Sequence, residues 1–485
     1  MRRYLICVAL IVLTGLPAPR IAFGASSACD LNSDGAVNVV DVQLEINQAL
    51  GVLPCTNGSL DGSGHCNVTD VQRVVNAALG GICRMGSGPA WYVSPTGVDT
   101  NGCTQASPCR QITRALSLVG PGDTIIVADG DYSAFTVDSL NGTATNPIVI
   151  VAQGQNANIQ PVSGVRDTIF VTFSSYIVLD GLHSFNANRA AVRIDNSPNV
   201  TVQNGVFGNN ATWGIFTDFS DHLLIQSNEC YGSQTQHGIY VSNSGDWPVV
   251  RKNLLHDNAG AGLQLNADAS QGGDGIITGA VLEDNIIYNN GSAGGSAINL
   301  DGVQYSTIRN NLLYNNHASG IAMFKIDGAE GPVGNLVYNN TINMATDGRW
   351  ALRIDSSAGA NTIRDNILYN SNPNHGGFDL TNATDVADTD SDYNIFGGGN
   401  WASTPDDGTT FYTLSQWQSQ GHDPHSFVAT LSSLFVNPPA NDYHLLATSP
   451  AVDTGQTLPS VTADMDGNPR PQGTASDIGC YEYPK

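Results

Sequence analysis

Residues 311–323 read NLLYNNHASGIAM, and residues 285–300, NIIYNNGSAGGSAINL, repeat the same order of residue types. The pattern recurs between residues 177 and 370, and each unit opens with an asparagine: Asn204, Asn228, Asn253, Asn285, Asn311, Asn340 and Asn366. An apolar residue follows two positions later: Val206, Cys230, Leu255, Ile287, Leu313, Ile342 and Leu368. The spacing between successive asparagines is the length of one unit. A unit this short cannot bury its own apolar face, so the repeat indicates units that stack on one another.

Later in each unit, two aliphatic residues flank a variable one, as in Ile239-Tyr240-Val241 and Ile298-Asn299-Leu300. Alternation with period two predicts a strand with one buried face. Frequent Gly and Asn argue against helices. The units, with asparagine amides bonded from coil to coil, predict a parallel β-solenoid. They resemble the right-handed parallel β-helix of the pectate-lyase-like proteins over about residues 90–400. The predicted fold class is therefore mainly β, with a small α-helical calcium-loop module before the β-helix.

Composition limits the function and the compartment. The chain has 485 residues, 43 acidic against 19 basic side chains and a net charge of −24. This balance argues against nucleic acid as a partner, because phosphates require basic surface. Residues 1–25 place two arginines before a short apolar run that ends in small residues. They predict a cleaved secretory signal and hence a secreted, extracellular protein; the alternative is an uncleaved anchor. No later segment is predicted to span a membrane.

Exported cysteines meet oxidising conditions, so disulfides are expected. Cys103 and Cys109 flank a short loop and predict one bridge. Four cysteines share the amino-terminal module and allow two more, with their pairing left open: Cys29, Cys55, Cys66 and Cys83. Cys230 falls in the inward column and predicts a buried thiol. Cys480 has no obvious partner.

The module at residues 28–84 contains a pattern of oxygen-bearing side chains. Positions one, three, five, nine and twelve of the first loop are Asp30, Asn32, Asp34, Asn38 and Asp41, and Gly35 permits the turn. Oxygens at alternate positions can converge on one hard cation, so the loop predicts a calcium (Ca2+) site of EF-hand type. The pattern returns 29 residues later, where the candidate ligands are Asp61, Ser63, Asn67 and Asp70. A carboxylate is missing at the start of this second loop, where Ser59 stands, so weaker binding is expected there.

Two such loop–helix units resemble a dockerin, the calcium-folded module that binds a cohesin. The resemblance implies a cohesin-bearing scaffold as a partner. The alternative is that calcium merely holds together a small cap with little core of its own. Dockerins more often lie carboxy-terminal to an enzyme than amino-terminal to it, so the position of this module before the β-helix is unusual for a dockerin.

The rest of the chain divides by composition. Residues 85–89 predict a linker. Residues 90–400 predict the β-helix, which a strand and a short helix near residues 111–116 would cap. Residues 401–485, where periodicity fades, resemble the closing module of secreted bacterial β-helix proteins and predict a carboxy-terminal cap.

The outward residues of stacked strands should form a ladder along the solenoid. The variable column gives one row: Arg193, Phe216, Tyr240, Gln264, Asn299, Ala322, Arg353 and Asp379. The outward position two residues later gives the second: Asp195, Asp218, Ser242, Asn266, Asp301, Phe324, Asp355 and Thr381. A linear polysaccharide would lie along such a strip. The candidate substrate-binding residues are Tyr240, Gln264, Asn266, Asn299 and Asp355.

The leading hypothesis is a calcium-assisted lyase of an acidic polysaccharide. Such a lyase neutralises the uronate carboxylate and removes the neighbouring proton with a base. The candidate catalytic residues are Lys325 as base, Arg353 against the carboxylate, Asp301, and His237 as a second base. The long unit after Asn253 inserts residues 267–279, and its Asp268 and Asp274 are candidate calcium ligands with Asp301.

Two rival functions stay open. Asp301 and Asp355, two rungs apart, would suit a glycoside hydrolase with paired carboxylates. A strip without a convergent site would suit a glycan-binding or adhesion protein. Each candidate also has a plain structural reading: an aspartate after a strand can cap a turn, Lys325 can be a solvated rim residue, and His237 can stabilise a loop.

Overall fold

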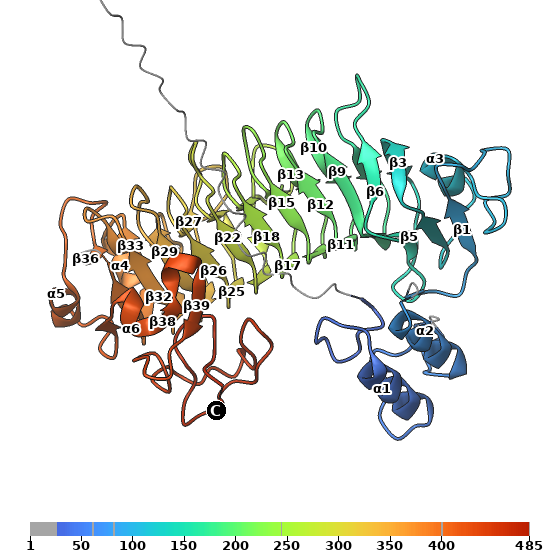
Figure 1. Cartoon of the computed structure of the whole chain (residues 1–485). Coiled ribbons are helices and arrows are strands. Elements are labelled where there is room, and N and C mark those ends of the chain that lie inside the picture. Colours follow the sequence, from blue (N-terminus) through green and yellow to red (C-terminus); the bar gives the residue numbers. More distant parts are fainter. Residues whose placement is uncertain (1–26, 61–62, 81–82, 244, 399–400, 485) are drawn as a thin grey trace, which may run out of the picture.

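The computed structural model describes residues 27–60, 63–80, 83–243, 245–398 and 401–484. Within these residues the chain forms a parallel β-solenoid of three long sheets, as predicted (Figure 1). The amino-terminal module lies beside the first turns, and the carboxy-terminal segment lies at the other end. The predicted signal peptide, residues 1–25, lies outside the described residues. No described helix is both long and apolar enough to cross a bilayer.

Each turn of the solenoid contributes one strand to each sheet. Sheet 1 contains β1 (Ala90–Val93), β2 (Thr124–Val127), β5 (Ile148–Ala152), β8 (Ile177–Asp180), β11 (Thr201–Gln203), β14 (Leu224–Gln226), β17 (Val249–Arg251), β21 (Val281–Glu283), β25 (Thr307–Arg309), β28 (Leu336–Tyr338), β31 (Asn361–Arg364) and β34 (Thr389–Asp392). Sheet 2 contains β4 (Phe135–Asp138), β7 (Ile169–Thr172), β10 (Ala190–Asp195), β13 (Trp213–Asp218), β16 (Ile239–Ser242), β19 (Leu263–Asn266), β23 (Ile298–Asp301), β27 (Ile321–Phe324), β30 (Leu352–Ile354), β33 (Gly376–Leu380) and β36 (Trp401–Thr404). Sheet 3 contains β3 (Gly130–Ser133), β6 (Ala157–Gln160), β9 (Leu182–Phe185), β12 (Val206–Gly208), β15 (Glu229–Tyr231), β18 (Leu254–His256), β22 (Ile286–Tyr288), β26 (Leu312–Tyr314), β29 (Thr341–Met344), β32 (Ile367–Asn370), β35 (Ile395–Gly397) and β37 (Phe427–Val428).

The inward aliphatic residues of the three sheets form one continuous core along the solenoid. A buried asparagine ladder runs beside it, as the sequence predicts: Asn228, Asn253, Asn285, Asn311, Asn340, Asn366 and Asn394. Each of the first six donates its Nδ2 to the Oδ1 of the next asparagine and to a backbone carbonyl. Two shorter ladders were not foreseen: Asn258–Asn290–Asn316 and Asn335–Asn361. These bonds satisfy buried backbone groups at the corners, which would otherwise destabilise the stack.

The structure corrects one unit of the predicted repeat. Gly205, and not Asn204, occupies the ladder position of its turn, since its N–H donates to the ladder asparagine of the next turn at 3.0 Å. The inward residue is accordingly Phe207, which is 1 % exposed and pairs with Cys230, whereas Val206 is half-buried. A slip of one residue in a strand exchanges the two faces.

The amino-terminal module contains the helices α1 (Val39–Ala49) and α2 (Val68–Ala78), which pack together over a small core. Disulfides join Cys29 to Cys83 and Cys55 to Cys66, so all four module cysteines are paired. The predicted Cys103–Cys109 bridge is also present. Cys230 and Cys480 are buried free thiols.

Both ends of the solenoid are covered. Helix α3 (Ile112–Leu116) packs against the first strands, as expected of a cap. At the other end, α5 (Leu414–Ser419) buries Trp417 in the core. The remaining short elements are α4 (Ala383–Ala387), α6 (Leu431–Leu434), η1 (Pro438–Ala440), the pair β20 (Ile277–Thr278) and β24 (Val303–Gln304), and the pair β38 (Phe435–Asn437) and β39 (Asp442–Leu445). The final segment returns along sheet 3, where Tyr443 lies 5.5 Å from Tyr314. It therefore covers a side of the solenoid as well as its end.

Candidate functional site

The outer face of sheet 2 carries the two predicted rows of side chains in one strip. The strand register places Arg193 beside Phe216, Phe216 beside Tyr240 and so on along the first row to Asp379. The second row runs from Asp195 through Asn266 and Asp301 to Phe324. The strip therefore has the register predicted from the sequence.

The amino-terminal part of the strip is aromatic. The ring of Phe216 stacks on Tyr240 at 5.2 Å and on Trp213 at 4.2 Å. The Arg193 guanidinium lies 3.9 Å from the centroid of Phe216 and donates to Asp218 at 2.8 Å. Apolar ring faces with fixed polar groups beside them are typical of ligand sites.

In the middle of the strip, four predicted substrate-binding residues form two hydrogen-bonded pairs. Asn266 Nδ2 donates to the Tyr240 hydroxyl and to Asp327, both at 3.2 Å. Gln264 accepts from Asn299. Burial raises the pKa of Tyr240, so its hydroxyl keeps its proton at neutral pH. Asp327 was not predicted, because it lies on a loop beyond β27 where strand register gives no position.

Asp301 has a structural task that the sequence did not reveal. Its carboxylate accepts the N–H groups of residues 326, 327 and 328 at 2.9, 2.9 and 3.1 Å. The residue is only 2 % exposed. Asp301 therefore holds the loop that follows Lys325, and its oxygens are already occupied.

The structure gives the candidate catalytic residues different surroundings. Lys325 is exposed directly after β27, whose neighbour in the sheet is β30 with Arg353. Burial lowers the pKa of His237 to about 4, and its Nδ1 accepts the N–H of Ala261 at 2.9 Å. His237 is thus neutral, with its basic nitrogen engaged. Lys325 is the candidate base that remains free to meet a substrate.

The candidate calcium ligands of the strip also lie apart. Asp268 is half-buried and Asp274 is exposed on the inserted loop, which is tied to the next turn by a bond from Ala269 N to Asp327 O at 3.0 Å. The Asp301 carboxylate already accepts three backbone N–H groups, and calcium at this set stays a prediction. Among the residues that the structure describes, no three His, Cys, Asp or Glu side chains form a group that could hold a metal ion.

Arg353 is surrounded by carboxylates. It donates to Asp407 at 2.8 Å, to Asp355 at 3.2 Å and to Asp379. Asp355 also accepts from Thr381 at 3.1 Å. The positive charge of Arg353 is therefore already balanced within the protein.

The first loop of the amino-terminal module, where the sequence predicts calcium, is held by a network of hydrogen bonds to its oxygen-bearing side chains. Asp30 accepts the N–H groups of Asp34 and Gly35 at 3.1 and 2.8 Å, while Asn32 and Asp34 side chains meet at 2.7 Å. Burial, and then the charges of Asp41 and Asp34, raise the pKa of Asp30. Asp41 accepts Leu31 N–H at 2.8 Å and caps α1. A divalent cation would offset the carboxylate repulsion in this loop.

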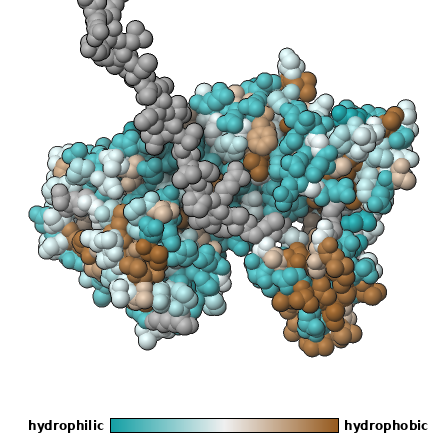
Figure 2. Space-filling view, viewed as in Figure 1, coloured by the Kyte–Doolittle hydropathy of each residue, from teal (hydrophilic) through white to brown (hydrophobic). Residues whose placement is uncertain are grey.

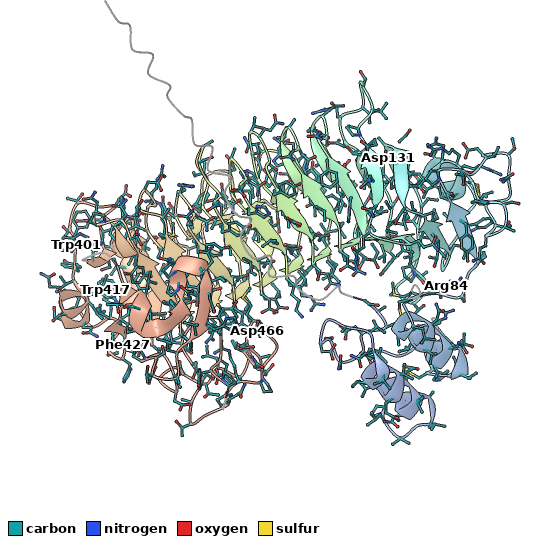
Figure 3. All side chains as sticks on the ribbon, in the orientation of Figure 1. Arg84, Asp131, Trp401, Trp417, Phe427 and Asp466 are labelled. Atoms are coloured by element: carbon teal, nitrogen blue, oxygen red, sulfur yellow. A yellow bond between two sulfur atoms is a disulfide. The ribbon has the colours of Figure 1, made fainter. Side chains whose placement is uncertain are left out.

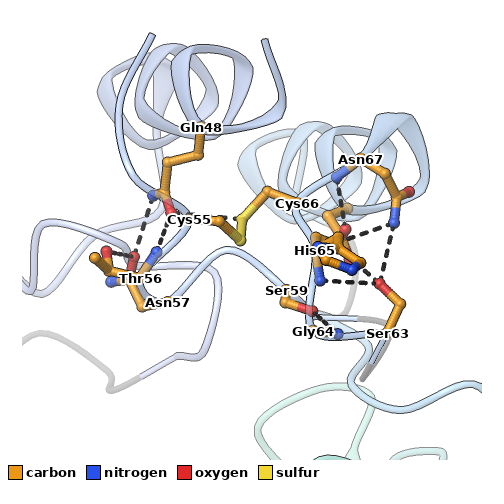
Figure 4. The surroundings of a disulfide bond; sticks show 11 residues. Gln48, Cys55, Thr56, Asn57, Ser59, Ser63, Gly64, His65, Cys66 and Asn67 are labelled. Carbon is orange, nitrogen blue, oxygen red and sulfur yellow. Dashed lines mark hydrogen bonds between the residues drawn. A yellow bond between two sulfur atoms is a disulfide. The ribbon is translucent and has the colours of Figure 1, made fainter. Parts of the chain in front are cut away.

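The second loop offers fewer carboxylates. Asn67 and Ser63 bond to each other at 3.5 Å and both bond to the backbone of His65, next to the Cys55–Cys66 disulfide (Figure 4). Asn67 N–H donates to Asp70 at 3.0 Å, in the same capping arrangement as in α1. The candidate ligand Asp61 lies outside the described residues.

Known proteins resemble this chain over part of its length. Residues 91–234 match the family described as Pel9A-like, right handed beta helix region. The uncharacterized protein YwoF of Bacillus subtilis (strain 168) is 25 % identical over 233 residues, and the match spans 45 % of each chain. The crystal structure of pectate lyase Pel9A superposes with a TM-score of 0.52 at 15 % identity, covering 81 % of this chain and 96 % of that one. The lacto-N-biosidase of Eubacterium ramulus gives 0.45 at 12 % identity, with 70 % of each chain covered.

The family match and the Pel9A superposition agree on the fold. The chain has the fold of a right-handed parallel β-helix, as the repeat predicts. The chain spans less than half the length of its curated relative YwoF. The fold alone does not define a reaction, which depends on the side chains of the strip.

Proposed function

We propose that this is a secreted, carbohydrate-active β-helix protein that binds an acidic polysaccharide along sheet 2 and cleaves it by β-elimination. The observation that carries the proposal is the strip on sheet 2. It begins with aromatic side chains, continues with side-chain amides in its middle, and has the exposed Lys325 beside these amides. Three disulfides and the signal-like amino terminus support export.

Lys325 is the base in this proposal. Its neutral amine takes the proton from the carbon next to the uronate carboxylate, the electron pair forms a carbon–carbon double bond, and the bond to the glycosidic oxygen breaks; that oxygen leaves with the bonding pair and takes a proton from water. The Asp301 carboxylate holds the backbone just after Lys325 and so limits where that amine can reach. Because the strip carries more carboxylates than free cations, we expect an anionic polymer to bind more tightly as salt screens the repulsion.

The hydrolase alternative has weaker support. Paired-carboxylate hydrolysis needs one protonated acid and one free base. Asp301 is saturated by backbone N–H groups, and Asp355 is bonded to Arg353. A non-catalytic glycan binder is the second alternative and requires only the strip.

The experiment incubates the purified chain with pectate, alginate, glycosaminoglycans and neutral plant glycans, each with calcium and with chelator. Unsaturated product is followed by ultraviolet absorbance and new ends by a reducing-sugar assay. The Lys325→Gln variant should lose at least a hundredfold in elimination, whereas Lys252→Gln, on another face, should keep wild-type rates. Reducing ends without unsaturation would indicate hydrolysis, and binding without product would indicate a glycan-binding protein; either result rejects the lyase.

A second function, docking, is favoured by the surface of the amino-terminal module. Large apolar side chains are exposed at equivalent positions of its two repeats: Val39 and Val68 are 76 % and 79 % exposed, and Leu50 and Leu79 are 73 % and 83 % exposed. Figure 2 shows this module as the part of the visible surface where apolar residues gather most. Apolar side chains at both ends of a helix pair suit a protein partner. We propose that the calcium-folded module binds a cohesin-bearing scaffold.

Docking and calcium can be tested together. Calorimetric titration against a panel of recombinant cohesin domains should give binding with calcium and none with chelator. Val39→Asp with Val68→Asp should abolish binding, while Asp34→Ala should abolish the calcium dependence of the module's unfolding temperature. If calcium raises that temperature but no cohesin binds, the module is only a cap.

A further inference from the structure

The strip does not stay open at its carboxy-terminal end. After β36 the chain turns back, and Tyr412 pairs with Ser403 through a bond of 2.9 Å. The segment 405–411 then crosses the outer face of the last strands, because Asp407 N–H donates to Leu380 O at 3.1 Å and its carboxylate reaches Arg353 at 2.8 Å. Figure 3 shows Trp401 at this end of the solenoid. A polymer lying along the strip would meet this segment.

A pocket of about 270 Å³ lies where the segment meets the strip. Its lining includes Trp350, Arg353, His375, Asp379 and Phe411. Its volume approaches the lower end of the range for small-ligand sites, about 300–1,000 Å³. The pocket can thus hold about one sugar ring and little more.

The aromatic walls of the pocket are fixed by packing. Trp350 stacks on Phe411 at 6.1 Å and meets His375 edge-on at 5.5 Å. Phe411 in turn lies 5.4 Å from Trp401. Rings held in place by their neighbours bind an apolar sugar face at little cost in conformational entropy.

The polar groups of the pocket include two buried atoms without hydrogen-bond partners. Asp379 is 4 % exposed; one of its oxygens binds Arg353, but Oδ1 has no hydrogen-bond partner. His375 Nδ1 is likewise buried without a partner. A buried polar atom left unpaired destabilises the protein, so a ligand hydroxyl that donates to it gains affinity.

The charges of the pocket favour an uncharged ligand. Arg353 is balanced by three carboxylates, and burial, then the charge of Arg349, lowers the pKa of His375. A uronate carboxylate would have to displace Asp407 or Asp379 from Arg353, and the exposed Arg349, which also lines the pocket, would give it only a solvent-screened ion pair. A neutral sugar only has to donate its hydroxyls.

We infer that this pocket binds the terminal residue of a glycan chain, and that this residue is an uncharged sugar. A second step rests on the proposed function. If the strip cleaves an acidic polysaccharide and the pocket binds its neutral terminal residue, the substrate contains neutral as well as acidic residues and is attacked from one end. The Asp379 carboxylate is the specificity-determining group, because its free oxygen selects a hydroxyl donor.

The binding test uses short probes and does not depend on cleavage. Xylotriose, cellotriose and trigalacturonate are titrated by calorimetry and by tryptophan fluorescence, which reports on Trp350. We expect a neutral trisaccharide to bind, and Asp379→Asn and Phe411→Ala each to weaken it at least tenfold. Asp390→Asn is the matched control, because Asp390 is also an arginine-bonded carboxylate of these turns but lies in sheet 1, on Arg364. The Asp390→Asn variant should bind the neutral trisaccharide as tightly as the wild type does.

Three results would overturn the inference: neither neutral probe binds, trigalacturonate binds more tightly than both, or Asp390→Asn weakens binding as much as Asp379→Asn. The end-on mode is tested separately on any polymer that is cleaved. Attack from an end should leave viscosity high while product accumulates, and an early fall in viscosity would reject it. Since probe binding is measured without turnover, failure of the lyase proposal and failure of the pocket are distinguishable.

Discussion

The buried asparagine ladder offers the sharpest test of what holds the solenoid together. The Asn311 side chain makes four hydrogen bonds: Oδ1 accepts from Asn285 N and Nδ2 at 3.0 and 2.9 Å, and Nδ2 donates to Leu282 O and Asn340 Oδ1, both at 2.9 Å. At about 0.5–1.5 kcal/mol for each bond, Asn311→Ala should lower the free energy of unfolding by about 2–6 kcal/mol. Asn311→Asp keeps the volume but loses the donors and adds a buried charge, so it should cost at least as much.

The assay is equilibrium unfolding in guanidinium chloride, followed by far-ultraviolet circular dichroism and by tryptophan fluorescence. Agreement between the two probes checks that the solenoid unfolds as one unit, which a repeat structure does not guarantee. The control is Asn158→Ala on β6, whose exposed amide makes one bond, to Asp131 at 3.3 Å. Its cost should stay within about 0.5 kcal/mol.

If Asn311→Asp unfolds at the wild-type midpoint, the hydrogen bonds that the Asn311 amide donates do not stabilise the solenoid, and only the shape of the side chain matters. Equal costs for Asn158→Ala and Asn311→Ala would also contradict the prediction. In that case any amide on the solenoid would matter equally, and burial of the ladder would carry no special weight.

Two further predictions concern the register and the module. Phe207→Ala should cost about 3–5 kcal/mol, since its ring is buried, and Val206→Ala less than about 1 kcal/mol; equal costs in the same unfolding assay would contradict the corrected register. Burial, then a nearby acidic charge, raises the pKa of Glu45 from 4.5 to about 7, and neither of its oxygens has a partner. The folded module therefore holds this proton more tightly than the unfolded chain, so the contribution of Glu45 to stability is fully present below pH 4.5 and is lost as the pH rises through 7. Glu45→Gln should raise the module's unfolding temperature at pH 8 but not at pH 4.5 in calorimetry with chelator, and the exposed Glu330→Gln should change neither; a pH-independent effect would refute the assignment.

The fold could be predicted because the same physical requirement recurs in every turn. An inward aliphatic and a corner asparagine are needed each time the chain passes, so errors in one unit are outweighed by the others. Asn204 was assigned wrongly because it lies next to the true ladder position, Gly205. In the sequence, an asparagine beside the ladder position cannot be distinguished from one in it. Only the bond from Gly205 to the next turn distinguishes the two.

The strip could be predicted for the same reason, and the pocket could not. Outward rows follow from the inward ones by alternation, so Tyr240 and Arg353 were placed without any contact being known. Asp407 lies 54 residues after Arg353, in a segment without periodicity. Nothing in the local sequence indicates that this segment folds back over the strip.

Asp301 explains why the residue types alone gave an ambiguous chemistry. In a one-dimensional reading, an aspartate on the strip next to a lysine-bearing strand fits a metal ligand, a hydrolytic base and a turn cap equally well. The three N–H groups that it accepts show that it caps the loop that follows Lys325. The acidic residue that looked catalytic therefore orders the backbone beside the proposed base. Loss of Asp301 should therefore lower activity through the position of Lys325.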